Sequence, residues 1–265
     1  MFPLYTKVFP ASAAELSALL NASIQKGFAK AAQPVAIRDE SYPQLAEISI
    51  TLDGAELRSD APRPPRASGA GKAGLQVREL QVTADDMRLG PALGSIRLRA
   101  RDVVLNQATD AKGDLLLVLQ SATEGRVEVS ALKAEIENAI ATVAKQEAGK
   151  HGVAIDGVQL TVRLRGESGV DAEVQLRAKK LFFTTNLKIA AQLDLDAQLN
   201  ATLAGLACQA DGAIGALACG ALQPHLQKLE GRSFALLALP LGEVRLREMR
   251  LATGETLSVT ADFGA

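Results

Sequence analysis

The sequence predicts an α+β protein: an elongated, highly curved antiparallel sheet wrapped around amphipathic helices, as a single domain over residues 1–265. Two observations predict this architecture. Apolar residues alternate with polar ones without a break from Leu187 to Leu203, a length that would extend roughly 55 Å at about 3.3 Å per residue. Three other alternating runs slip by one residue, which is typical of strands that carry β-bulges, and bulges bend sheets.

The composition excludes several classes of protein. Of the 265 residues, 48% are hydrophobic and 22% charged, and the net charge is −1. A nucleic-acid-binding protein would normally carry a clearly basic domain, and a disordered chain would be far more polar. No run of 18 apolar residues predicts a membrane-spanning helix.

Three amphipathic helices are expected. The first covers about residues 12–32 and opens with a capping box at Ser12 and Glu15. The second runs from Ser130 to Ala148, and the third from Ala213 to Glu230 with Pro224 as a kink. Their apolar faces contain Leu16, Leu20, Ile24 and Phe28 in the first helix, Leu132, Ile136, Ala139, Ile140 and Val143 in the second, and Leu217, Leu222, Leu226 and Leu229 in the third.

Between the first two helices the sequence predicts a flexible loop and bulged strands. The segment at about 58–74 is rich in proline and glycine, which favours a loop. The alternation slips at three places: between Leu75–Val77 and Leu80–Val82, between Ile96–Ala100 and Val103–Leu105, and between Val244–Leu246 and Met249–Leu251.

Two features leave alternatives open. Cys208 and Cys219 either form a disulfide that joins the long strand to the third helix or remain two buried thiols. Arginines recur at outward strand positions, where they form either a basic surface for anionic lipid head groups or part of an ordinary solvated sheet face. These arginines are Arg97, Arg99, Arg101, Arg163, Arg165, Arg245 and Arg247.

The sequence resembles the LmeA-like phospholipid-binding family of the tubular lipid-binding (TULIP) superfamily. The similarity covers about residues 44–265 and rests on the phrase Leu239–Gly242 before a two-strand hairpin, and on the helix opening Val129–Leu132. The resemblance implies a curved sheet around a long helix, with an apolar tunnel for acyl chains. No nucleophile with its base and no metal-ligand spacing accompanies these phrases, so we expect neither catalysis, a metal nor a cofactor.

These observations predict a protein that binds a lipid, with a phospholipid as the first expectation, for transport, storage or sensing. An enzyme acting on a lipid or glycolipid, and a structural domain with a dry core, are the alternatives. We expect a lipid or fatty-acyl ligand, transient contact with a membrane surface and no nucleic acid; the oligomeric state is left open. The sequence contains no signal peptide, which favours the cytoplasm; a periplasmic or secreted protein is the alternative if a leader precedes it. The predicted lipid-binding residues are Leu16, Leu20, Ile24, Phe28, Leu193, Leu195, Leu199, Leu217, Leu222 and Leu226.

Overall fold

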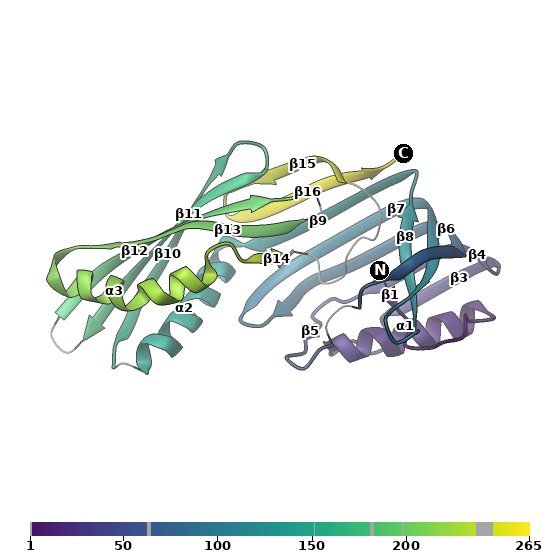
Figure 1. Cartoon of the computed structure of the whole chain (residues 1–265), viewed down its shortest axis with the longest axis horizontal. Helices are drawn as coiled ribbons and strands as arrows, with labels where there is room; N and C mark the ends of the chain where they lie inside the picture. Colours follow the sequence, from purple (N-terminus) through teal and green to yellow (C-terminus); the bar gives the residue numbers. More distant parts are fainter. Residues whose placement is uncertain (1, 63–64, 151, 181–182, 198, 237–245) are drawn as a thin grey trace.

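Two β-sheets and three helices make up the part of the chain that the structure, a computed structural model, describes: residues 2–62, 65–150, 152–180, 183–197, 199–236 and 246–265. The sheets lie end to end along the long axis (Figure 1). Helix α1 (Ala13–Gly27) lies at one end, and α2 (Lys133–Gly149) and α3 (Gly212–Leu229) lie at the other. The predicted mixture of strands and three helices, with strong sheet curvature, is confirmed.

The strands fall into a large and a small set. The first sheet contains β1 (Phe2–Pro3), β2 (Phe28–Ala29), β3 (Val35–Ser41), β4 (Gln44–Thr51), β5 (Glu56–Leu57), β6 (Ser68–Leu89), β7 (Ala92–Thr109), β8 (Leu115–Ser121), β9 (Glu124–Leu132), β15 (Leu246–Ala252) and β16 (Thr256–Gly264). The second sheet contains β10 (Ala154–Arg165), β11 (Gly169–Lys180), β12 (Phe183–Leu195), β13 (Asn200–Ala210) and β14 (Ser233–Ala235).

The first sheet is ordered β15-β16-β9-β7-β6-β4-β3 and is mixed rather than wholly antiparallel. Strands β4 and β6 pair in parallel, with Gln44 opposite Gln76 and Thr51 opposite Thr83. The segment between these strands carries the chain back to the end of the sheet at which β4 began. The second sheet follows sequence order from β10 to β14, and every pairing in it is antiparallel.

The first sheet bends where the alternation of inward and outward side chains slips by one residue in both β6 and β7. The two slips lie at positions that pair with each other. Val77 pairs with Val103 and Leu80 with Ala100, so the two residues between these pairs on each strand face outward together. Asp102 has a φ of 47° at this point. Here β7 also exchanges neighbours, pairing with β9 up to Arg101 and with β8 from Val104 onward. The predicted slip near the C-terminus is a register shift between Arg247 and Arg250, whereas Val244 lies outside the described residues.

The predicted single strand from Leu187 to Leu203 is wrong, because the chain turns after Leu195. The Leu199 amide donates to the Asp196 carbonyl at 3.0 Å, and the Asp196 carboxylate accepts the Asn200 amide at 2.8 Å. The four residues between β12 and β13 preserve the alternation of apolar and polar residues across the turn. The alternation of residues therefore gave no indication that the chain reverses direction after Leu195.

The predicted loop at 58–74 is too long, since β6 begins at Ser68. The pairing with β7 is irregular there, with register shifts between Ser68 and Lys72 and between Ala73 and Leu75. At Gly74 a Cβ would lie 2.5 Å from the Leu105 carbonyl oxygen, so the close approach of the two strands requires glycine. The glycines that suggested a loop therefore belong to a strand.

Helix boundaries also differ from the expectation. The first helix ends at Gly27 rather than near residue 32, because Phe28 and Ala29 pair with β5. Its predicted cap is present: the Ser12 hydroxyl accepts the Glu15 amide at 3.2 Å. The second helix begins at Lys133 because residues 130–132 pair with β16.

Each sheet has its own apolar cluster. The larger cluster includes α1 and strands of the first sheet, and the smaller one lies between the second sheet and helices α2 and α3. Leu199, in the turn between β12 and β13, is 0% exposed and belongs to the larger cluster. The turn therefore anchors the second sheet to the first.

Candidate functional site

The inner face of the second sheet is an array of apolar side chains aligned across four strands. Because the strands pair antiparallel with aligned residues, these side chains form rows across β10, β11 and β12, and three of the four rows continue onto β13. The four rows, named here the apolar face, are Val158–Leu176–Leu187–Ala210, Leu160–Val174–Ile189–Cys208, Val162–Ala172–Ala191 and Leu164–Val170–Leu193–Leu203.

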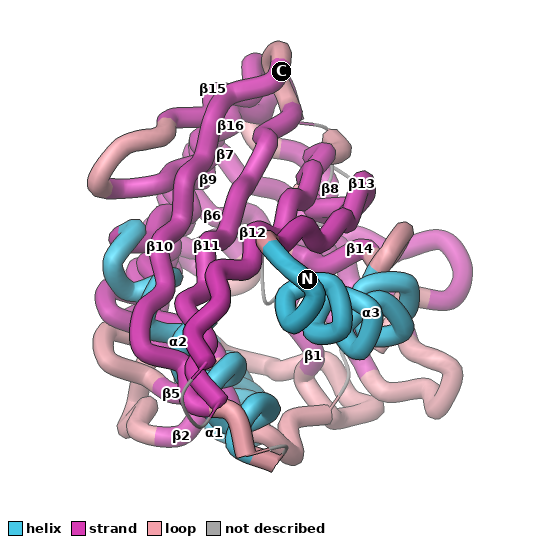
Figure 2. Tube along the Cα trace, turned by 90° about the vertical axis from the view of Figure 1, so that its left-hand side faces the viewer, coloured by secondary structure: helices cyan, strands magenta, loops and turns pink. Residues whose placement is uncertain are grey.

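Helices α2 and α3 cover only part of the apolar face. Helix α2 lies along β10 and α3 lies along β13 and β12, and the two helices stand apart (Figure 2). The first two rows pack against residues of both helices, and Leu176 and Leu187 are 7% and 4% exposed. In the last two rows the side chains are partly exposed, and Leu164 reaches 50%. The apolar face therefore extends beyond its helical cover.

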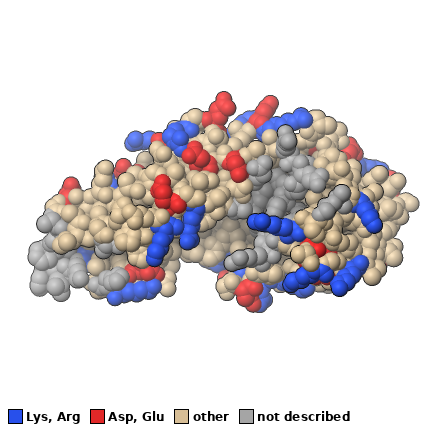
Figure 3. All heavy atoms as spheres, viewed as in Figure 1, with Lys and Arg blue, Asp and Glu red and all other residues tan. Residues whose placement is uncertain are grey.

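The outer face of the same sheet carries paired charges. Arg165 lies 3.1 Å from Asp171 and 2.7 Å from Asp194. The Gln175 amide donates to Glu173, and Lys188 lies 3.7 Å from the same carboxylate; together they lower the pKa of Glu173. Acidic and basic side chains are likewise interspersed in Figure 3.

On the first sheet, two of the predicted outward arginines are paired with acidic residues. Arg97 forms an ion pair with Asp85 at 3.0 Å, and Arg101 lies 3.6 Å from Glu124. At Arg126, the hydrogen bond from its guanidinium lowers the pKa of Asp262. These pairs favour the interpretation of a solvated sheet face with balanced charge. Arg245 lies outside the described residues.

The structure separates the predicted lipid-binding residues into two groups. The α1 residues pack in the larger cluster, with Leu16 at 0% and Ile24 at 6% exposure, and Leu199 lies in that cluster as well. Leu222 packs in the smaller cluster, and Leu193 and Leu195 lie on the partly exposed part of the second sheet. The first and third helices are at opposite ends of the molecule, so α1, α3 and β12 do not meet at one site. Whether any of these residues contacts a lipid stays a prediction.

On α3 the predicted inward face is partly wrong. Leu226 is 7% exposed, but Leu217 is 76% exposed and Leu229 is 36% exposed. On α2, Val143 is 48% exposed although it was expected to face inward. The predicted site did not include β10 and β11, although the alternation of Val158–Leu164 and Val170–Ala178 indicates their apolar sides.

Cys208 and Cys219 form a disulfide that joins β13 to α3. The alternative of two free thiols is therefore wrong in this structure. Cys208 belongs to the second row of the apolar face, opposite Ile189, so the disulfide lies beside the candidate site.

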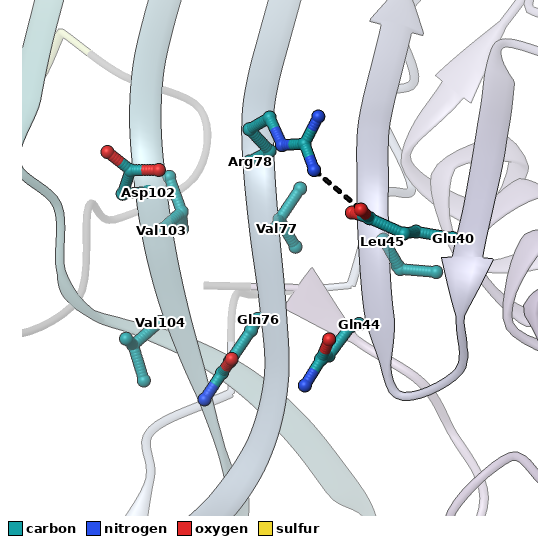
Figure 4. A pocket seen from close by; sticks show the side chains of 9 residues that line it. All are labelled: Glu40, Gln44, Leu45, Gln76, Val77, Arg78, Asp102, Val103 and Val104. Atoms are coloured by element: carbon teal, nitrogen blue, oxygen red, sulfur yellow. Dashed lines mark hydrogen bonds and ion pairs between the residues drawn. The ribbon is translucent and has the colours of Figure 1, made fainter.

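A polar pocket of about 290 Å³ lies on the outer side of the bend in the first sheet (Figure 4). Arg78 and Glu40 form an ion pair of 2.6 Å at its rim, and Asp102 accepts a hydrogen bond from Thr123 at 2.9 Å. Gln44 and Gln76 lie at its other side. All of these polar side chains are exposed, so the pocket is open to solvent rather than an enclosed binding site.

Among the described residues, no three His, Cys, Asp or Glu side chains lie close enough to hold a metal ion. In the same part of the chain, no helix has the length and apolar character needed to cross a bilayer. Comparison of the chain with protein-family models, with curated proteins and with solved structures found no match. The phrase Leu239–Gly242, which carries part of the family resemblance, lies outside the described residues.

Proposed function

We propose that the protein binds the acyl chains of a lipid, with a phospholipid as the first candidate, on the apolar face of the second sheet. The observation that carries this proposal is the partial cover of that face by α2 and α3. Water-exposed rows of Leu, Val and Ala are costly for a soluble protein at about 25 cal/mol per Å² of apolar surface, and an acyl chain would remove that surface from water.

The shape of the site supports the same proposal. Binding sites for small apolar ligands are concave and mostly apolar, and they lie preferentially between packed elements. The apolar face lies between two helices, and its third row contains two small residues, Ala172 and Ala191. These features support our proposal of a TULIP-like lipid carrier that performs no catalytic step.

The first test identifies a bound lipid. Organic extraction of the purified full-length protein, followed by mass spectrometry, is expected to release phospholipid. A fatty acid carrying a nitrobenzoxadiazole group is expected to gain fluorescence when it is mixed with delipidated protein. Protein that contains no lipid and takes up none would overturn the proposal in favour of a structural domain with a dry core.

A matched pair of variants locates the site. Ala191 lies on the apolar face, and its neighbour Ala190 lies on the opposite face, where it pairs with Glu173 and Ala207. We expect A191W to lower lipid loading, because the indole occupies the space above the third row, and A190W to load as the parent does. Equal loading by two folded variants would place the lipid elsewhere.

A further inference from the structure

The disulfide is placed where it can control access to the apolar face. Cys208 and Cys219 are the only cysteines of the chain and are 11 residues apart. Both are partly exposed, so a reductant can reach them. The bond fastens the second turn of α3 to β13, and reduction would remove this tether without affecting any other covalent link.

Among the side chains that the structure describes, few other interactions hold the N-terminal half of α3 in place. This half contains Gly212, Gly215 and Gly220, and glycine is unfavourable in helices. Asp211 precedes its first turn, but its side chain makes no capping hydrogen bond. The sequence from 212 to 227 contains no Asp, Glu, Lys or Arg, so this part of the helix forms no ion pair between these side chains. This half therefore depends on its contact with the sheet.

The contact between the N-terminal half of α3 and the sheet is close but buries a polar group that has no partner among the described residues. Gly215 lies so close to β12 and β13 that a Cβ would be 2.6 Å from the Ala210 side chain and 3.0 Å from Thr185 Oγ1. The Thr185 hydroxyl is buried there and has no hydrogen-bond partner among the described residues. A buried hydroxyl without a partner destabilises the state that buries it. Lifting this half of α3 would return the hydroxyl to water.

The C-terminal half is held more firmly. Glu230, just after the helix, accepts the amides of Gly205 and Leu206 at 2.9 and 3.0 Å, and Leu226 is buried. Among the side chains that the structure describes, α3 makes further apolar contacts through Ala218 and Cys219 in its N-terminal half and through Leu222 in its C-terminal half. The two halves of α3 thus differ in their attachment, and the disulfide joins the weakly held half to the sheet.

We propose that the Cys208–Cys219 disulfide is a redox-controlled latch, which keeps the N-terminal half of α3 closed over the apolar face and slows the entry of lipid. This proposal rests on the function proposed above. A dithiol reductant opens the latch: the sulfur–sulfur bond accepts two electrons and two protons and becomes two thiols, while the dithiol becomes a disulfide. The freed half-helix then uncovers the rows that end at Cys208 and Ala210, and acyl chains enter between α3 and the face of β12 and β13.

Lipid uptake tests the latch directly. The rate of fluorescence gain with the nitrobenzoxadiazole fatty acid is compared for oxidised protein and for protein treated with dithiothreitol. We expect a several-fold faster rate after reduction. The variant C208S/C219S should load at the fast rate without dithiothreitol and should not respond to it. Equal rates in the two redox states would overturn the latch, whereas no loading in either state would overturn the proposed function.

Hydrogen exchange provides a readout that needs no lipid. Reduction should accelerate exchange of the amides in residues 212–219 and leave α2 unchanged. T185V removes the unpartnered hydroxyl with little change in shape, and it should slow exchange of the same amides in the reduced protein. Unchanged exchange in α3 after verified reduction of the disulfide would contradict the latch even if the protein binds lipid.

Discussion

The carboxylate of Glu230 accepts a hydrogen bond from the backbone amide of Gly205, at the point where the pairing of β13 with β12 is irregular. The pairing of β12 with β13 shifts between Ala190 and Gln192, so the amides of Gly205 and Leu206 leave the regular ladder. Both amides donate to Glu230, one to each oxygen. The end of α3 is thus attached to the strand beneath it by two charge-assisted hydrogen bonds.

We expect E230Q to loosen this attachment. The amide side chain retains one oxygen acceptor, but its nitrogen cannot accept the second amide, so one of the two backbone N–H groups loses its partner. Hydrogen exchange should become faster at Gly205 or Leu206. Q227A, one turn earlier on an exposed position, should leave exchange there unchanged. Similar exchange in E230Q and the parent would show that the cap contributes nothing in solution.

Ile24 discriminates between an open tunnel and a packed core at α1. Its side chain is 6% exposed within the larger apolar cluster, so we expect I24W to overpack the core and to destabilise the protein by about 1–3 kcal/mol. The melting temperature measures this, and Q25W, at an exposed position of the same helix, is the control. A variant that melts normally but no longer loads lipid would instead place a lipid tunnel beside α1.

Leu199 should be costly to truncate although it lies in a turn. It is completely buried in the larger cluster, and Leu→Ala changes at such sites cost about 2–5 kcal/mol. L217A provides the matched control, because Leu217 is 76% exposed and surface changes of this kind stay within about 0.5 kcal/mol. Urea unfolding compares the two variants. Equal midpoints would mean that the turn does not anchor the second sheet.

Tyr42 should make the stability depend on high pH. Its hydroxyl donates to the Pro10 carbonyl at 2.6 Å, and burial, with Glu15 and Asp39 nearby, raises the pKa of Tyr42 to about 12 from a usual value of 10.0. Because the folded protein keeps a proton that the unfolded chain releases, stability is present below pH 10 and falls as the pH rises toward 12.

Absorbance at 295 nm measures this titration, since the chain has two tyrosines and no tryptophan. In Y5F only Tyr42 remains, and its midpoint should lie well above that of the same variant in denaturant. A midpoint that is the same in folded and unfolded protein would contradict the partly buried hydrogen bond from Tyr42 to Pro10.

The curvature of the sheet could be predicted from the sequence because the alternation of buried apolar and exposed polar residues can be followed along a single strand. The slip between Val77 and Leu80 is visible in the order of residues and needs no knowledge of the partner strand. The turn at Asp196–Leu199 escaped prediction because it contains no glycine or proline and preserves the alternation. The reversal becomes visible in the structure, for example in the pairing of Leu193 with Leu203.

The orientation of α3 was not predictable for a related reason. Leucines occur on several sides of this helix, so periodicity alone could not select the inner face. The bond to Cys208 turns Cys219 toward the sheet. Leu217, two residues earlier, is then rotated by about 200° and faces outward. A disulfide that the sequence left open therefore decides which leucines can reach the apolar face.

The aligned slips of β6 and β7 restrict how this chain can change in length. Inserting one residue into β6 beyond Val77 would reverse which side chains of its remaining length point inward, while Val103 and its neighbours on β7 kept theirs. The error would propagate along more than one pairing, since β6 also pairs with β4. An insertion in these strands therefore needs either a compensating change in the partner strand or a β-bulge, such as the register shift between Ala84 and Met87 of β6. Relatives of this chain should preserve the length of both strands, change both together, or carry a bulge at the altered position.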